Sequence, residues 1–222
     1  MTLKAENLSK RYMRKTGQAN YFYAVRGASL ELRPGEVTVL MGRSGSGKTT
    51  LLHMLSGLLT PSEGRVWLGD TDLYALDDRA LSRLRNQKIG VVPQGRSAID
   101  SLTVLENVLL PERMYGGGDE NNALRWLEAL EIVQLKDARP AELSGGELRR
   151  MAIARAMAQD PAVLLADEPT GDLDDVSTGR VLTVLKEAAT GGMAVLIVSH
   201  DSEGERYADG LYRMDGGAIG EE

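Results

Sequence analysis

The chain has 222 residues, 42% of them hydrophobic, with 26 lysine and arginine residues against 32 aspartate and glutamate residues, a formal net charge of −6. This length suits one large domain or a domain with a subdomain. The acidic balance argues against a nucleic-acid partner, since non-specific nucleic-acid binders are basic, and the absence of cysteine excludes disulfides and thiolate metal sites.

No segment of the sequence is suited to crossing a membrane. The start, Met1–Glu6, lacks the apolar core of a signal peptide. The longest strongly apolar stretch, Met193–Val198, is far shorter than the ~20 residues that span a bilayer. We therefore expect that this chain does not cross a membrane by itself.

Two sets of strands are expected. Edge strands at Leu3–Leu8, Tyr21–Val25, Ala28–Leu32 and Arg65–Leu68 predict a small antiparallel layer. Short apolar runs predict buried parallel strands at Val37–Met41, Ile89–Val92, Ala162–Ala166 and Ala194–Val198. Each of these runs leads into a polar motif, and open α/β sheets bind their ligands at the carboxyl ends of the strands.

The first of these motifs fits the pattern of a phosphate-binding loop in full. It follows a strand, opens a helix, and consists of Gly42, Arg43, Ser44, Gly45, Ser46, Gly47, Lys48 and Thr49, with Thr50 as a further contact. The glycines let backbone amides surround phosphates, while Lys48 reaches the β and γ oxygens and the Thr49 hydroxyl binds Mg²⁺. The alternative, a plain Gly/Ser-rich turn, does not explain the Lys-Thr pair.

A leucine stripe predicts a helix after this loop, with Leu51, Leu52, Leu55, Leu58 and Leu59 on one face and Pro61 just beyond its end. His53 lies beside the stripe and is assigned no role.

From about Gly95 to Gln159 the pattern is mostly helical, with a flexible break at Gly116–Gly118. We interpret residues 95–160 as a helical subdomain inserted into a single α/β domain that spans residues 1–222. Gln94, at the start of this stretch, has an amide that can bind Mg²⁺ and orient water, although a glutamine after a strand is usually an ordinary loop residue.

The run Leu143-Ser144-Gly145-Gly146-Glu147 predicts a second anion site, at a helix start. The same residues also form a capping box, in which Ser144 and Glu147 satisfy free amides. Capping alone does not explain Gly145 and Gly146, since a glycine within a helix lowers the stability by as much as ~1 kcal/mol relative to alanine. A nucleotide bound between two copies of the chain, one at each of its ends, would explain the second site.

Two further strands end in candidate catalytic groups. Asp167 suits Mg²⁺ coordination, and Glu168 suits a general base for an attacking water; ordinary solvated acids are the alternative. His200 could donate to a γ-phosphate oxygen, although alone it is more readily a strand-end histidine.

Taken in this order, the motifs resemble those of the ATP-binding subunit of ABC transporters over nearly the whole chain. Gln94 matches the Gln loop, Leu143–Glu147 the signature, Gly171–Asp174 the D-loop and His200 the switch histidine. The resemblance implies the ABC ATPase fold, a RecA-like P-loop NTPase core with an antiparallel β layer and an inserted α-helical subdomain, and implies ATP and Mg²⁺ as ligands. It also implies that Tyr12 stacks on adenine with Val25 nearby, although Tyr12 could be a plain surface aromatic.

Within that family, Ala166–Asp174 and Ser101–Val108 resemble the branch that includes lipoprotein-release, macrolide-export and antimicrobial-peptide-resistance ATPases. Pro93 and Gly95 depart from the aromatic-rich surroundings usual at that Gln loop. The ending Glu147–Arg150 also varies from the usual signature, and we expect it to change no catalytic atom.

The resemblance implies a dimer, most simply a homodimer, closed around two ATP molecules. It also implies a membrane permease that contacts Gln94–Pro111 at the cytoplasmic face of the membrane, with ATP hydrolysis driving export or extraction of a substrate. A regulatory ATPase that drives a membrane complex without transport is the alternative. DNA-repair and translation-associated relatives fit less well, because this chain has neither a long insertion nor a second cassette.

Overall fold

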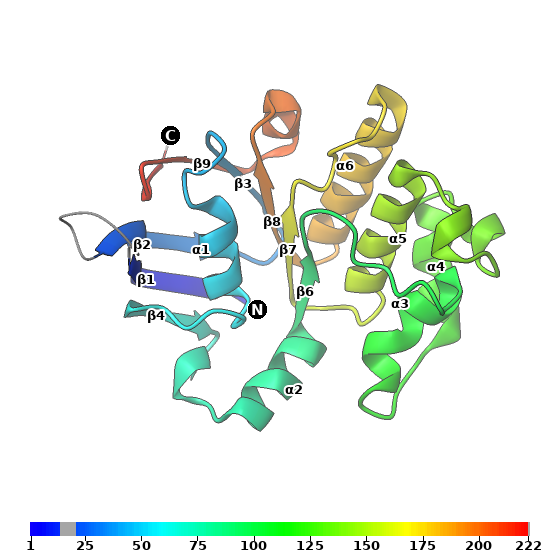
Figure 1. Ribbon diagram of the computed structural model, residues 1–222, viewed down its shortest axis with the longest axis horizontal. Coiled ribbons are helices and arrows are strands. Elements are labelled where there is room, and N and C mark those ends of the chain that lie inside the picture. Colours follow the sequence, from blue (N-terminus) through cyan, green and yellow to red (C-terminus); the bar gives the residue numbers. More distant parts are fainter. Residues whose placement is uncertain (14–20, 222) are drawn as a thin grey trace.

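Two sheets and the helices between and beside them form the molecule in a computed structural model that describes residues 1–13 and 21–221 (Figure 1). One sheet is antiparallel, in the order β2 (Tyr21–Leu32), β1 (Leu3–Met13), β4 (Glu63–Leu68) and β5 (Thr71–Asp72). The other has the order β10 (Ala218–Glu221), β9 (Gly210–Asp215), β3 (Val37–Met41), β8 (Ala194–Ser199), β7 (Val163–Asp167) and β6 (Ile89–Val92). In it, β9 to β6 run parallel and only β10 is antiparallel to its neighbour.

The helices follow the loops after these strands. The α-helices are α1 (Lys48–Leu55), α2 (Asp78–Lys88), α3 (Val104–Arg113), α4 (Glu120–Ala129), α5 (Gly145–Met157) and α6 (Asp175–Thr190). Short 3₁₀ turns are η1 (Leu73–Ala75), η2 (Val133–Leu135), η3 (Pro140–Glu142) and η4 (Ser202–Tyr207). In Figure 1, α1 lies between the two sheets, whereas α3, α4 and α5 lie on the far side of β6 and β7.

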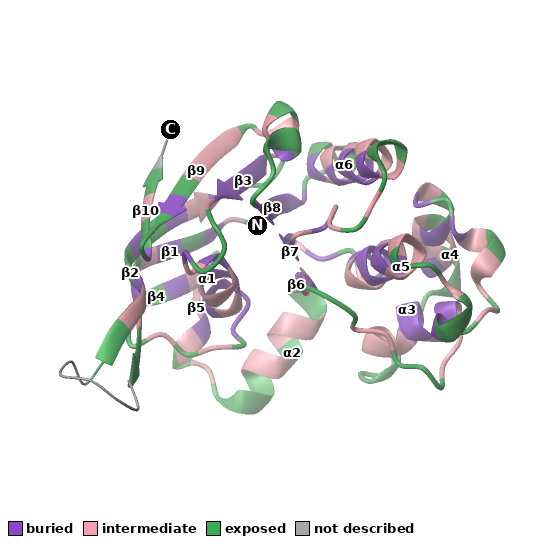
Figure 2. Cartoon of the chain, turned by 45° about the horizontal axis from the view of Figure 1, so that its top comes forward, coloured by how far each residue is buried: buried purple, intermediate pink, exposed green. Residues whose placement is uncertain are grey.

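The parallel sheet is buried on both faces, which explains its continuous apolar strands. In β7, Val163 and Leu165 join the core that contains α1 and the antiparallel sheet. Leu164 and Ala166, which point the other way, join the core formed with α3 to α6. Figure 2 shows buried residues along these strands and on the inward faces of the helices. The four predicted parallel strands are confirmed to within one residue at their ends.

Other predicted elements differ from the structure. Tyr21–Val25 and Ala28–Leu32 form one strand, β2, because Gly27 at φ +59° continues the chain through a register irregularity. The predicted leucine stripe is too long: α1 ends at Leu55, Gly57 at φ +72° turns the chain away, and Leu58 is 54% exposed.

Several elements lay outside the sequence predictions, among them α2, β9 and β10. Helix α2 has no buried residue and therefore no strong apolar stripe. Strands β9 and β10 form a hairpin through Gly216 and Gly217, both at positive φ. The sequence Asp215-Gly216-Gly217 is a recognisable hairpin signal, although the strands it joins are not continuous apolar runs.

Asn107 fixes the loop that precedes α3. Its side chain is fully buried; its Oδ1 accepts from the Ile99 N–H at 2.8 Å, and its Nδ2 donates to the carbonyls of Ile99 at 3.1 Å, Leu102 at 3.3 Å and Thr103 at 2.9 Å. One amide thus satisfies backbone groups that would otherwise be buried without partners. This gives the segment Ser101–Val108 a structural role that its sequence resemblance did not specify.

We expect Asn107→Ala to lower the free energy of unfolding by about 1–3 kcal/mol, because it leaves buried backbone groups unpaired. Chemical denaturation measures this. Asn121→Ala on α4 is the matched control, since Asn121 is exposed; a change there stays within about 0.5 kcal/mol. Equal, small effects of both substitutions would contradict the role given to Asn107.

Candidate nucleotide-binding site

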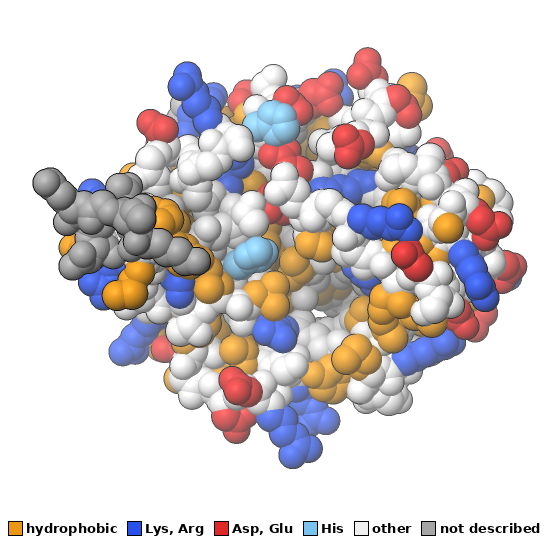
Figure 3. All heavy atoms as spheres, in the orientation of Figure 1, with side chains coloured by type: hydrophobic (Ala, Val, Ile, Leu, Met, Phe, Trp, Pro, Cys, Tyr) orange, Lys and Arg blue, Asp and Glu red, His pale blue; other side chains and the backbone are white. Residues whose placement is uncertain are grey.

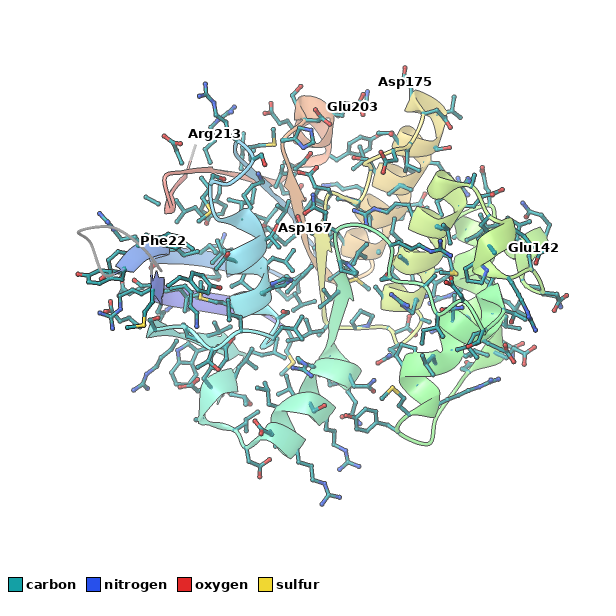
Figure 4. The ribbon with its side chains drawn as sticks, in the orientation of Figure 1. Phe22, Glu142, Asp167, Asp175, Glu203 and Arg213 are labelled. Carbon is teal, nitrogen blue, oxygen red and sulfur yellow. The ribbon has the colours of Figure 1, made fainter. Side chains whose placement is uncertain are left out.

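A cavity of about 1280 Å³ opens at the carboxyl ends of β3, β7 and β8. It brings together motifs far apart in the sequence: the loop 42–50 with Gln94, Asp167, Glu168 and His200, and the aromatic residues of β1 and β2. Figure 4 places Asp167 at the end of β7 in the middle of the molecule, with Phe22 to one side on β2. The predicted meeting of polar motifs at this edge is therefore what the structure shows.

Close backbone packing determines the shape of the phosphate loop. A Cβ on Gly47, which has φ +109°, would lie 2.2 Å from the Ala24 carbonyl oxygen, and a Cβ on Gly42 would lie 2.4 Å from that of Met214. The β9–β10 hairpin also supports the loop, because the Gly217 N–H donates to the Ser46 carbonyl at 3.0 Å. At these two positions only glycine fits without a shift of the backbone.

The loop holds polar groups suited to phosphates. The Lys48 ammonium donates to the carbonyls of Gly42 at 2.6 Å and Arg43 at 3.1 Å, inside the cavity. Ser46 Oγ is buried and has no hydrogen-bond partner among the described residues. A buried hydroxyl without a partner is unfavourable unless a ligand satisfies it, and a phosphate oxygen would do so.

Thr49, at the start of α1, and Asp167, at the end of β7, lie next to each other in the lining of this cavity. The Thr49 hydroxyl donates to Asp167 Oδ2 at 2.7 Å, and Asp167 is 2% exposed. Within the described residues no cluster of three or more His, Cys, Asp or Glu side chains could hold a metal. The hydroxyl and carboxylate oxygens of Thr49 and Asp167 are of the kind that Mg²⁺ bound with a nucleotide prefers, since that ion takes one or two protein ligands and completes its shell with phosphate oxygens and water.

Glu168 and His200 form a pair beside the phosphate loop. His200 Nδ1 lies 2.8 Å from Glu168 Oε1. The hydrogen bond to Glu168 raises the pKa of His200 above its ordinary value of 6.5, and the charges of Glu168 and Asp201 add to this, while partial desolvation and Lys48 oppose it. Glu168 itself has φ +52°, a left-handed conformation uncommon for a residue with a side chain.

The signature Ser144–Glu147 lies apart from this cavity. Ser144 caps α5 in a capping box: its Oγ accepts from the Glu147 N–H at 3.3 Å, and its own N–H donates to Glu147 Oε2 at 2.7 Å. Hydrogen bonds from the backbone and side chain of Ser144 hold the pKa of Glu147 below its ordinary value.

Gly145 and Gly146 differ in their surroundings. A Cβ on Gly145 would meet nothing within 4 Å, and a Cβ on Gly146 would lie 3.1 Å from Leu173 Cδ2. Gly145 lines a smaller, adjoining cavity of about 330 Å³, which shares Glu168 and His200 with the larger one. Figure 4 shows Glu142, just before the signature, on the side of the molecule opposite Phe22.

The aromatic side of the cavity has more residues than the sequence predicted. The rings of Tyr12 and Phe22 stack with centroids 5.8 Å apart, and both line the cavity together with Tyr23 and Ala24. Val25, predicted to lie near the base, is fully buried in the core and does not line the cavity. Val25 instead packs in the core that contains α1 and the antiparallel sheet.

Arg149 is a polar contact of the site that the sequence reasoning missed. This residue of α5 is 8% exposed, and its guanidinium donates to the carbonyls of Pro93, Asp167 and Glu168. Burial lowers its pKa, which the carboxylates of Asp167, Glu168 and Asp172 partly restore. Its sequence signal is the unusual ending Glu147–Arg150, which we expected to change no catalytic atom; the structure shows that this ending contacts the Glu168 backbone through Arg149.

Comparisons with known proteins agree with this geometry. A family described as ABC transporter matches residues 25–171. The chain is 40% identical over 221 residues to the lipoprotein-releasing system ATP-binding protein LolD of Pseudomonas syringae pv. tomato, covering 98% of this chain and 96% of that protein. It is 41% identical over 198 residues to an uncharacterized ABC transporter ATP-binding protein of Mycobacterium tuberculosis, covering 86% of this chain but spanning only 60% of that relative.

Solved structures are similar over almost the full chain. The dimeric structure of MJ0796, a bacterial ABC transporter cassette, has a TM-score of 0.91 and 35% identity, covering 99% of this chain and 97% of that one. The dimeric post-hydrolysis state of MJ0796, bound to ADP and Pi, has the same TM-score and identity. Among the described residues, no helix has the length and apolar character needed to span a bilayer.

We expect Glu168→Gln to lower the pKa of His200, because the substitution removes the charge that favours the imidazolium. NMR titration of the ring protons measures this, with His53 on α1 as an internal control. By linkage, the stabilisation from the His200–Glu168 pair is full below pH 6.5, the ordinary pKa, and is lost as the pH rises through the raised folded value. An unchanged His200 titration in the variant would contradict the pairing.

Proposed function

The chain belongs to the ABC transporter family, and we propose that it is the ATP-binding and hydrolysing subunit, working as a dimer with each ATP held between two copies. One observation carries the proposal: the cavity gathers the phosphate loop, Asp167, Glu168 and His200, while the signature Ser144–Glu147 stays outside it. The solved relative MJ0796 is dimeric.

The cavity suits ATP from end to end. The aromatic pair Tyr12 and Phe22 supplies a surface for the adenine ring. The amides of the loop 42–50, with Lys48 and Ser46 Oγ, would bind the phosphates. The Thr49 hydroxyl and Asp167 would hold Mg²⁺, with Gln94 at the same cavity as a further ligand or water contact. When bound, Mg²⁺ neutralises charge on the β and γ oxygens.

The chemistry falls to Glu168 and His200. Glu168 lines the cavity beside the phosphate loop, where its carboxylate would orient a water and accept its proton. Lys48 and a protonated His200 would stabilise the charge on the transferred phosphoryl group. The bond from His200 to Glu168 fixes the direction of the carboxylate.

The signature would complete the site of the partner copy. Ser144, Gly145, Gly146 and Glu147 begin α5, and the capping box already occupies the N–H groups of Ser144 and Glu147. The amides of Gly145 and Gly146 would therefore be the ones that face an anion at this helix N-terminus. The space over Gly145 leaves room for a phosphate to approach the backbone. Binding of ATP would then favour the closed dimer, because its γ-phosphate contacts both copies only in that state.

A membrane subunit would dock beside Gln94–Pro111. A cavity of about 350 Å³ lies between α2, β6, α3 and α5, with Leu110 and Pro111 in its lining. Around it, Leu58 is 54% exposed, Met114 70% and Tyr115 41%. Figure 3 shows hydrophobic side chains beside a hollow between α2 and α3. Residues 95–160 would act as the helical subdomain that carries the motion.

With such a docking partner, the chain would lie at the cytoplasmic face of a membrane. The similarity to LolD supports export or extraction as the driven process.

The first test is Glu168→Gln. We expect the variant to bind ATP and to lose turnover by about a hundredfold or more. It should accumulate as an ATP-bound dimer, because ATP that is not hydrolysed keeps the dimer closed. Phosphate release measures turnover, and size-exclusion chromatography with ATP measures the dimer. A variant that hydrolyses ATP normally removes Glu168 from the role of base.

The second test separates the signature from the chain's own nucleotide. We expect Gly145→Leu to reduce ATPase activity about tenfold or more, because the side chain fills the space for the partner's ATP. Binding of a fluorescent ATP analogue to dilute monomer should be unchanged.

The matched control is Gly179→Leu, because Gly179 is also a helical glycine at which an added Cβ would meet nothing within 4 Å. A large loss of monomer affinity in the Gly145 variant, or equal losses of activity in both variants, would contradict the shared site.

A further inference from the structure

The guanidinium of Arg149 joins the ends of two strands. Its Nη1 donates to the Pro93 carbonyl at 2.6 Å, directly before Gln94, and its Nη2 donates to the carbonyls of Asp167 and Glu168 at the end of β7. Arg149 itself lies on α5, five positions after Ser144. One buried side chain therefore connects α5 to the backbone on either side of the candidate catalytic centre.

This burial is costly enough to indicate a role. A guanidinium at 8% exposure has lost most of its water, and its Nε has no hydrogen-bond partner among the described residues. An apolar side chain would fill the same space on α5 without that cost. What the guanidinium adds is a planar set of donors that reaches several carbonyls at once.

Glu168, whose carbonyl accepts from Arg149, has an unfavourable backbone conformation. Glu168 has φ +52°, and a non-glycine residue in this region persists only where its surroundings fix it. Its N–H donates to the Val198 carbonyl at 2.9 Å, and its carbonyl accepts from the Gly171 N–H at 3.1 Å as well as from Arg149. Of these three hydrogen bonds, the one from Arg149 comes from a side chain, and it helps to hold Glu168 in this conformation.

We propose that Arg149 is a positioning residue for Glu168 and Gln94: it holds the backbone turn that directs the Glu168 carboxylate into the cavity, and anchors the loop that carries Gln94. The inference rests on the proposed ATPase function. Arg149 touches no reacting atom and acts through these two residues.

Arg155 offers a matched control on the same helix. It is also partly buried, and its guanidinium donates to Ser97, at 2.7 Å to the carbonyl and 2.6 Å to Oγ. Burial lowers its pKa as it does that of Arg149. Because these hydrogen bonds go to Ser97, Arg155→Met removes a partly buried arginine without removing a contact to Glu168.

The experiment compares Arg149→Met with Arg155→Met in the full chain. Thermal unfolding, ATP affinity, KM and kcat are measured for each, with NMR shifts of the His200 ring. We expect Arg149→Met to lower kcat about tenfold or more, since small misplacements of a catalytic group have effects of this size, with KM within about twofold. The His200 resonances should shift, because a displaced Glu168 carboxylate changes the 2.8 Å contact between His200 Nδ1 and Glu168 Oε1.

Arg155→Met should lower the unfolding temperature comparably, with kcat within about twofold of the parent and His200 unshifted. Arg149→Lys keeps the positive charge but loses the planar set of guanidinium donors. If the Met variant does not fold, the Lys variant must show a smaller loss of kcat and a smaller His200 shift. The positioning role is overturned if kcat and the His200 shifts stay at parent values, or if both Met variants lose activity equally. Absence of turnover in the parent would instead contradict the proposed function, and the His200 shifts would still decide the positioning.

Discussion

The site depends on one constraint: the central parallel strands are buried on both faces, so their charged residues lie at their ends. In β7 the four residues Val163–Ala166 are fully buried, and the carboxylates begin at Asp167. Because the neighbouring strands are parallel, the loops after β3, β6, β7 and β8 open at the same edge of the sheet. Burial of the sheet thus brings together four motifs that are far apart in the sequence.

A second constraint shapes the phosphate loop within that edge. Gly42 and Gly47 lie against the carbonyls of Met214 and Ala24, which belong to β9 and β2. The loop is therefore packed between the strand that carries the aromatic residues and the hairpin at the end of the chain. The same cavity is lined by Tyr12 and Phe22 as well as by the carboxylates of Asp167 and Glu168.

Sequence alone predicted what local spacing determines. The loop 42–49, the acidic end of β7 and the capped start of α5 each combine a turn, a strand end or a helix start with polar residues at fixed intervals, so they could be located without tertiary information. Phe22 and Arg149 could not, because their partners lie on other elements: Phe22 stacks on a residue of β1, and Arg149 bonds to carbonyls at the ends of β6 and β7. Val25, which the resemblance implied near the base, is instead buried in the core beside the antiparallel sheet, a placement that depends on tertiary packing.

Helix α5 links two sites that the sequence presents as separate. Its first turn carries Ser144 and the glycines, proposed to contact the partner's ATP, and the next turn carries Arg149, which bonds to the Glu168 backbone of the same copy. A helix transmits a displacement along its axis with little loss, because its backbone hydrogen bonds resist bending within two turns. A phosphate that engages the amides at the start of α5 therefore acts on the same rigid element that holds Glu168. In the proposed dimer, contact at one ATP would thus be coupled through α5 to the position of the carboxylate at the other.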